Sequence, residues 1–131
     1  MPRLLKTACA ALAVGLLAVA PTFAADKLSP IGSWEVSTGE ARYKVMTCGG
    51  SGEICAKLVW LREDARTAEN LQYLNKYVVS HAVPASGNKW KATVNYEGEA
   101  LGGSVTMLGA NKLRLTGCKL IACNSFEFTR R

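Results

Sequence analysis

Apolar and polar residues alternate along most of the chain, and this alternation is its main structural signal. The clearest stretch is KWKATVNY over 89–96, where Trp90, Ala92, Val94 and Tyr96 alternate with polar side chains. A period of two is typical of a β-strand with one buried face. The same pattern predicts further strands in the segments SWEV, ARYKVMT, EICAKLVWLR, VVSHAVPA, GSVTML, KLRLTG and SFEFTR.

One segment departs from the alternation. The stretch REDARTAENLQYLNKY contains no Gly or Pro and is rich in residues that favour helices. Leu71, Leu74 and Val78 follow at helical spacing. This spacing predicts one short helix or helical loop over roughly 65–76.

Tight turns between the strand segments predict a meandering antiparallel sheet of about eight strands. Turn-forming residues such as Ser86-Gly87-Asn88 and Gly109-Ala110-Asn111 separate these segments. No predicted helix is long enough to cover the apolar face of the sheet, so the sheet is expected to close on itself, which also removes its edges. We therefore predict an all-β barrel. With about eight strands, its own side chains can fill it, or it can hold one small ligand.

The N-terminus has the composition of a secretory signal peptide. Arg3 and Lys6 precede an apolar run over 8–20, and Thr22 and Ala24 then supply small residues at the positions that a signal peptidase reads. The run is shorter than the roughly 20 apolar residues that span a bilayer, and nothing like a stop-transfer segment follows it. We predict a signal peptide over 1–24, cleavage near Ala24, no transmembrane segment after cleavage, and a periplasmic protein.

The remaining residues, 25–131, are expected to form a single domain with one core. The whole chain carries 16 Lys and Arg against 10 Asp and Glu, a formal net charge of +6. The basic residues are scattered and form no run, so we expect no nucleic-acid partner.

Export would leave four cysteines: Cys48, Cys55, Cys118 and Cys123. An even number in an oxidising compartment predicts two disulfides, for which three connectivities are possible. The spacing favours the local pairs Cys48–Cys55 and Cys118–Cys123, because each pair brackets a short reversal of the chain. A metal or redox role is the alternative, but neither pair has the Cys-x-x-Cys spacing typical of such sites.

Four segments, taken in order, resemble a family of exported bacterial proteins, domain of unknown function 2147. They are PIGSWEV, CGGSGEICAKLVWL, KWKATVNYEGEALGGSVTM and KLRLTGCKLIACNSFEFTR. The likeness covers nearly all of 25–131 and is most specific at the end, around Gly117-Cys118 and Phe128-Thr129-Arg130. It implies a small barrel of the calycin type, similar to lipocalins and fatty-acid-binding proteins, with no established activity.

The chain departs from the family pattern at several points. Ala56 stands where a Gly is usual, and Phe128 where the family ends in Trp-Thr-Arg. The segment DARTAENLQ lacks the acidic-Asn-Pro pattern that is expected after the third strand. A binding role of that connection is therefore the least transferable implication of the resemblance.

The resemblance also implies a structural role for the Gly-x-Trp of the first strand. In lipocalin-like barrels, a Trp at this place is covered by an Arg from the last strand. Arg130 is two and four residues beyond Phe128 and Phe126, so it has the same parity and its side chain should point to the same, inward face of the strand. Its guanidinium is therefore expected to lie over Trp34 as a cation–π contact. Gly32 would allow close backbone approach there. These implications assign Gly32, Trp34 and Arg130 to barrel closure.

Residues suited to catalysis are few. His81 is the single histidine, and a nucleophile–base pair needs a histidine beside a Ser or thiol and oriented by a third group. The Gly-x-Ser-x-Gly motif of hydrolases does not occur in the sequence. We assign no catalytic residue, no cofactor and no metal, and expect a protein that is not an enzyme.

Aromatic and apolar residues of the predicted inward face could line a pocket for a small apolar ligand. The pocket would open toward the helical connection. The candidate ligand-binding residues are Tyr43, Trp60, Tyr73, Tyr77, Trp90, Tyr96 and Met107. The alternative, favoured by the short chain, is that these side chains simply fill the barrel.

Three functions follow in order of preference. The first is a non-enzymatic envelope protein that binds a small apolar ligand or an envelope protein. The second is an interaction or inhibitor module that uses its outer surface and its disulfide-tied loops. The third is an enzyme.

Overall fold

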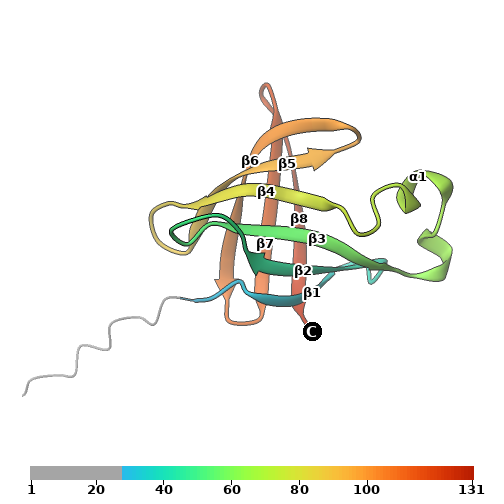
Figure 1. Ribbon diagram of the computed structural model, residues 1–131, viewed down its shortest axis with the longest axis horizontal. Helices are drawn as coiled ribbons and strands as arrows, with labels where there is room; N and C mark the ends of the chain where they lie inside the picture. The colour runs from blue at the N-terminus through green and yellow to red at the C-terminus, as the bar shows by residue number, and fades with distance from the viewer. Residues whose placement is uncertain (1–27) are drawn as a thin grey trace, which may run out of the picture.

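The computed structural model describes residues 28–131, so the expected signal peptide over 1–24 lies outside the described residues. Eight antiparallel strands follow one another in chain order and close into a barrel (Figure 1). The all-β meander and its closure are therefore confirmed. The strands are β1 (Gly32–Val36), β2 (Ala41–Thr47), β3 (Ile54–Leu61), β4 (Tyr77–Pro84), β5 (Lys89–Tyr96), β6 (Glu99–Gly109), β7 (Lys112–Lys119) and β8 (Ala122–Arg130).

The barrel has two unlike ends. Because neighbouring strands are antiparallel and follow chain order, alternate connections lie at the same end. The open end carries the β1–β2 turn, the helical connection between β3 and β4, the β5–β6 turn and the β7–β8 hairpin. The closed end carries the β2–β3 hairpin, the β4–β5 and β6–β7 turns, and the end of β8. In Figure 1, α1 lies beyond the ends of β3 and β4, and the β7–β8 hairpin projects from the barrel.

The helical connection is shorter than the predicted region over 65–76. It consists of a 3-10 turn, η1 (Glu63–Ala65), and one turn of α-helix, α1 (Ala68–Leu71). The Thr67 hydroxyl caps α1 by accepting a hydrogen bond from the Asn70 N–H at 3.1 Å. After α1 the chain returns alongside β3 before it enters β4. Within residues 28–131, no helix has the length and apolar character needed to cross a membrane.

One irregularity in β3 changes which side chains face inward. Tyr43 lies opposite Leu58, but the preceding residue of β2, Arg42, lies opposite Trp60. Val59 is therefore an extra residue, a β-bulge, and it reverses the alternation of the residues that follow. The apolar run of this strand consists of two alternating patterns joined at Val59.

The bulge places Trp60 on the outer surface of the barrel. Its ring lies against the guanidinium of Arg42, whose Cζ is 4.0 Å from the ring centroid. Leu58 and Leu61, on either side of the bulge, are both buried. The prediction that Trp60 belongs to the inward face was therefore wrong, because simple alternation does not account for the extra residue.

Apolar side chains fill the closed end and continue up the barrel wall. Trp34, Trp90 and Met107 are all at most 5% exposed. The main core cluster consists of Trp34, Val45, Ile54, Ala56, Val79, Ala82, Trp90, Ala92, Val94, Val105, Met107, Leu113, Leu115 and Phe128. A smaller cluster lies beside the helical connection and consists of Ala41, Leu58, Leu61 and Ala65.

Both predicted disulfides are confirmed. Cys48–Cys55 ties the β2–β3 hairpin at the closed end, and Cys118–Cys123 ties the β7–β8 hairpin at the open end. Each joins cysteines that are close in sequence, as expected for a bridge across a hairpin.

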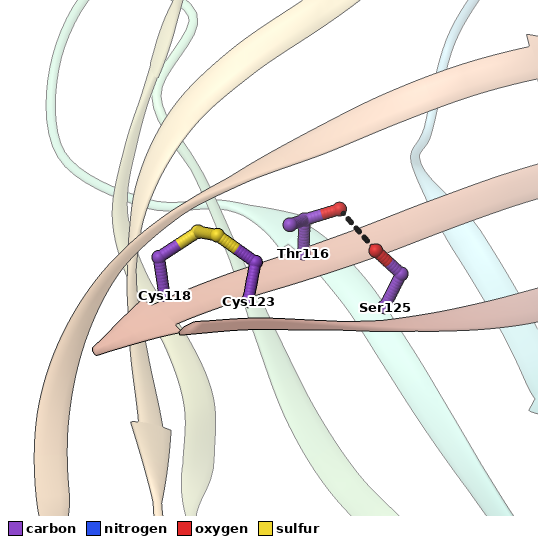
Figure 2. The surroundings of a disulfide bond; sticks show 4 residues. All are labelled: Thr116, Cys118, Cys123 and Ser125. Carbon is purple, nitrogen blue, oxygen red and sulfur yellow. Dashed lines mark hydrogen bonds between the residues drawn. A yellow bond between two sulfur atoms is a disulfide. The ribbon is translucent and has the colours of Figure 1, made fainter. Parts of the chain in front are cut away.

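The second disulfide belongs to a hairpin with further cross-strand contacts. Cys118 and Cys123 are direct partners in the β7–β8 ladder. Figure 2 shows that Thr116 and Ser125, another pair in the same ladder, point to the same side, with their hydroxyl oxygens 2.9 Å apart. The disulfide and the hydroxyl pair together hold the register of this hairpin.

Candidate ligand-binding cup

The barrel contains an apolar cavity of about 170 Å³ above its packed closed end. Six residues that line this cavity also line a wider hollow of about 790 Å³ at the open end, so the two spaces adjoin each other. The shared residues are Val36, Tyr43, Val78, Asn95, Tyr96 and Phe126. We call the two adjoining spaces together the cup, the inner one the cavity and the outer one the mouth.

Trp34 forms part of the cavity floor. It is 1% exposed, and its indole Nε1 donates a hydrogen bond to the carbonyl of Pro30 at 2.8 Å. The guanidinium carbon of Arg130 lies over the indole ring of Trp34, 4.3 Å from the ring centroid. This is the arrangement that the family resemblance implies, and it covers the indole at the point where β1 meets β8.

Arg130 also ties three chain segments together. Its guanidinium donates hydrogen bonds to the carbonyl oxygens of Ser29 at 2.6 Å, Ile31 at 2.8 Å and Ala110 at 2.9 Å. Gly32 has a φ of +135°, and a Cβ at this position would lie 2.8 Å from Nη1 of Arg130. A side chain at position 32 would therefore disturb the contact that closes this end.

Aromatic rings form much of the passage from cavity to mouth. The rings of Tyr96 and Phe126 are tilted by 43° with centroids 6.2 Å apart, and Tyr43 packs edge-on against Phe128 at 5.3 Å. Burial raises the pKa of the Tyr43 phenol, and the nearby carboxylate of Glu40 raises it further. Tyr43 therefore keeps its hydroxyl proton at neutral pH and can donate a hydrogen bond.

Carboxylates dominate the charge at the mouth, where Glu40, Glu69, Glu97 and Glu127 lie with one guanidinium, that of Arg114. Arg114 donates a hydrogen bond to Glu127 at 3.0 Å. This hydrogen bond, assisted by a nearby lysine, lowers the pKa of Glu127. Glu127 is therefore ionised at neutral pH, and its charge is compensated locally.

Three of the seven candidate ligand-binding residues line the cup. Tyr43 and Tyr96 line both the cavity and the mouth, and Tyr73 lines the mouth. Trp90 and Met107 instead belong to the packed core toward the closed end and line neither space. Both side chains point inward as predicted, but they lie closer to the closed end of the barrel than the cavity does.

Trp60 and Tyr77 lie outside the cup. The bulge in β3 turns Trp60 outward. Tyr77 is the first residue of β4, where it lies opposite Lys57 and is 46% exposed. The Lys57 ammonium is 4.9 Å from the centroid of its ring. The structure therefore does not bring Tyr77 to the cup with Tyr73, because the chain leaves the helical connection before position 77 and Tyr77 begins β4.

Several cup residues were missed from the sequence. Phe128 has the same parity as Phe126, so alternation alone could have identified it. Asn95 alternates with inward residues and was assigned to the outer face, yet it lines the cup near the end of β5 and donates a hydrogen bond to the Tyr77 carbonyl at 3.1 Å. Of the acidic residues of the mouth, Glu40 and Glu97 lie in turns, Glu69 in α1 and Glu127 in β8, and none carries a local sequence signal.

His81 lies on the outer surface at an irregularity of β4, where the register with β5 shifts between Ser80 and Val83. It is exposed, has a φ of +50°, and lines no part of the cup. In the part of the chain that the structure describes, no group of three or more His, Cys, Asp or Glu side chains is placed to hold a metal ion.

Fold and site together define a small β-barrel with one sealed end and one open apolar cup. Comparison with models of protein families, with curated proteins and with solved structures gives no match for this chain.

Proposed function

We propose that this chain is an exported, non-enzymatic binding protein that holds a small ligand with an apolar group in its cup. The observation that carries the proposal is an apolar cavity that lies between packed side chains toward the closed end and an adjoining hollow at the open end. In another protein, an apolar cavity of about 150 Å³ binds benzene. The cavity here therefore has room for a phenyl ring or an alkyl group of similar size.

Export and family membership are parts of the same proposal. Two disulfides support an oxidising compartment such as the periplasm, as does the signal-like composition of 1–24. The closed eight-stranded meander and the stacking of Arg130 on Trp34 support a calycin-type barrel and membership of the domain of unknown function 2147 family.

Filling the cavity tests the binding proposal. Ala56 lines the cavity, so in the variant Ala56→Phe the new ring would occupy the ligand's space. We expect 3-phenylpropan-1-ol to shift amide resonances around the cup of the wild-type protein. We expect Ala56→Phe to weaken this binding by about tenfold or more, since apolar burial supplies most of the affinity.

The matched control is Ala100→Phe, because Ala100 is exposed and lines no part of the cup. It should bind the alcohol as the wild type does. If Ala56→Phe fails to fold, Val105→Phe fills the same cavity from another strand. Unchanged binding in a folded cavity-filling variant, or shifts confined to the outer surface, would contradict the proposal.

The natural ligand can be sought directly by native mass spectrometry of protein taken from its own periplasm. A reproducible added mass that disappears in Ala56→Phe and persists in Ala100→Phe is the expected result. A bare protein mass across several preparations would argue against a tightly held ligand.

A separate observation favours a second function, docking to a partner protein. The tip of the β7–β8 hairpin is a two-residue turn made of Leu120 and Ile121, which are 95% and 100% exposed. Leu120 has a φ of +57°, a conformation that favours Gly. The tip thus holds two aliphatic side chains in water at a position that disfavours them. We propose that this pair inserts into an apolar pocket of an envelope protein.

The tip should contribute nothing to folding stability if it is kept for binding. We expect Leu120→Gly to raise the free energy of unfolding by up to about 1 kcal/mol, because Gly adopts positive φ without steric cost and no packing contact is lost. Urea denaturation measures the change, and Leu120→Ala, which keeps the steric cost, should show no such gain. A loss above about 1 kcal/mol in both variants would assign the tip a structural role instead.

Docking itself can be tested in producing cells with a photoreactive amino acid at position 120. A discrete cross-linked adduct is expected, and it should disappear when Ile121→Asp is added. An adduct that survives Ile121→Asp would contradict docking through the apolar pair.

A further inference from the structure

The charge of the mouth is opposite to that of the chain as a whole. The sequence has 16 basic and 10 acidic residues, yet four carboxylates and one guanidinium line the mouth. Arg114 is hydrogen-bonded to Glu127, so these two charges largely compensate each other. Glu40 has a weak partner, the Arg62 guanidinium at 4.0 Å. Glu69 and Glu97 form no ion pair with another residue of 28–131.

Aromatic rings lie among these carboxylates. Tyr73, Tyr96 and Phe126 line the mouth, and Tyr96 and Phe126 are 41% and 40% exposed. The face of an aromatic ring carries negative electrostatic potential and attracts ammonium groups. Carboxylates and aromatic faces together stabilise a cation at the mouth and disfavour an anion there.

We propose that the ligand of the cup is an amphipathic cation, whose apolar group enters the cavity while its ammonium group stays at the mouth. The inference rests on the proposed binding function and adds the charge of the ligand to it. The apolar part is about the size of a phenyl ring, since the cavity measures about 170 Å³. Fatty acids and other carboxylates of the same size are expected to bind more weakly.

Three probes of the same shape separate charge from apolar fit: 3-phenylpropan-1-amine, 3-phenylpropan-1-ol and 3-phenylpropanoate. Their dissociation constants are measured by amide-resonance titration at neutral pH, in low salt and in 0.5 M salt. We expect the amine to bind tightest and the carboxylate weakest, with a ratio of about tenfold in low salt, because several exposed charges each contribute a modest energy. High salt should reduce this ratio.

The double variant Glu69→Gln/Glu97→Gln should bring the affinities for amine and carboxylate to within about threefold of each other, with the affinity for the alcohol unchanged. The matched control is Glu53→Gln, which removes a carboxylate from the β2–β3 connection at the closed end. It should leave the order of the three probes as in the wild type.

The outcomes separate the two proposals. If the alcohol binds in the cup and the amine binds no better than the carboxylate, the charge inference fails and the binding cup stands. If the amine is preferred but the double variant keeps that preference, the mouth carboxylates are not its source and the inference fails. If none of the three probes binds in the cup, both the proposed function and this inference are refuted.

Discussion

Replacing Arg130 with alanine is expected to lower the free energy of unfolding by about 2–4 kcal/mol. The substitution removes the guanidinium that stacks on Trp34 and donates to the carbonyls of Ser29, Ile31 and Ala110. A cation–π contact alone contributes about 0.5–2 kcal/mol. Hydrogen bonds from a charged donor add to it, reduced here because they are partly exposed to water.

Arg131→Ala is the matched control because it removes the same side chain one position further on. Arg131 pairs with Glu35 at 2.9 Å, but its side chain is 48% exposed, so the loss should stay below about 1 kcal/mol. Arg130→Lys should fall in between, since an ammonium keeps the charge but cannot stack and reach three carbonyls as the planar guanidinium does. Urea denaturation followed by circular dichroism measures all three variants. Equal losses in Arg130→Ala and Arg131→Ala would refute a closing role for Arg130.

Removing the disulfide Cys48–Cys55 is expected to cost about 2–3 kcal/mol, the value of the chain-entropy model for a loop of this length. The two cysteines are seven residues apart, and Cys55 is 8% exposed and lines the cavity. The double variant Cys48→Ser/Cys55→Ala removes the bridge without placing a hydroxyl in the apolar wall. Its midpoint of urea denaturation should fall relative to the oxidised wild type.

The second disulfide provides the comparison. Cys118 and Cys123 are five residues apart and tie a hairpin whose tip is exposed, so Cys118→Ser/Cys123→Ser should cost less, about 1–2 kcal/mol. Reduction with dithiothreitol should lower the free energy of unfolding of the wild type more than it lowers that of either double variant, because the wild type loses two disulfides and each variant loses one. A larger loss from the Cys118/Cys123 variant than from the Cys48/Cys55 variant would contradict this order.

Local pattern was sufficient for most of the fold. Alternation with period two identifies a strand because successive side chains point to opposite faces of a sheet. It failed in β3, where Val59 is an extra residue. A bulge depends on the pairing between β2 and β3, so the sequence of one strand does not reveal it. Trp60 was consequently assigned to the wrong face.

The candidate site was predictable only in part. Tyr43 and Tyr96 could be found because inward parity places a side chain within the barrel. Parity says nothing of depth, however, and Trp90 and Met107 share it while lying in the packed core. Whether the barrel is full or hollow depends on how side chains from many strands fit together, and alternation along one strand does not contain that information.

The sequence by itself predicted the strands, their meander and the favoured disulfide pairs, because each depends on residues close together in the chain. Closure joins β1 to β8 at opposite ends of the chain, and it was predicted only indirectly, from the lack of a helix that could cover the apolar face. Only the tertiary structure decided that the closed end is packed while the open end holds a cup. It also decided that Glu40, Glu69 and Glu97, from three different connections, lie around one mouth. The physical reason is that closure of the barrel brings alternate connections to the same end, whatever their separation along the chain.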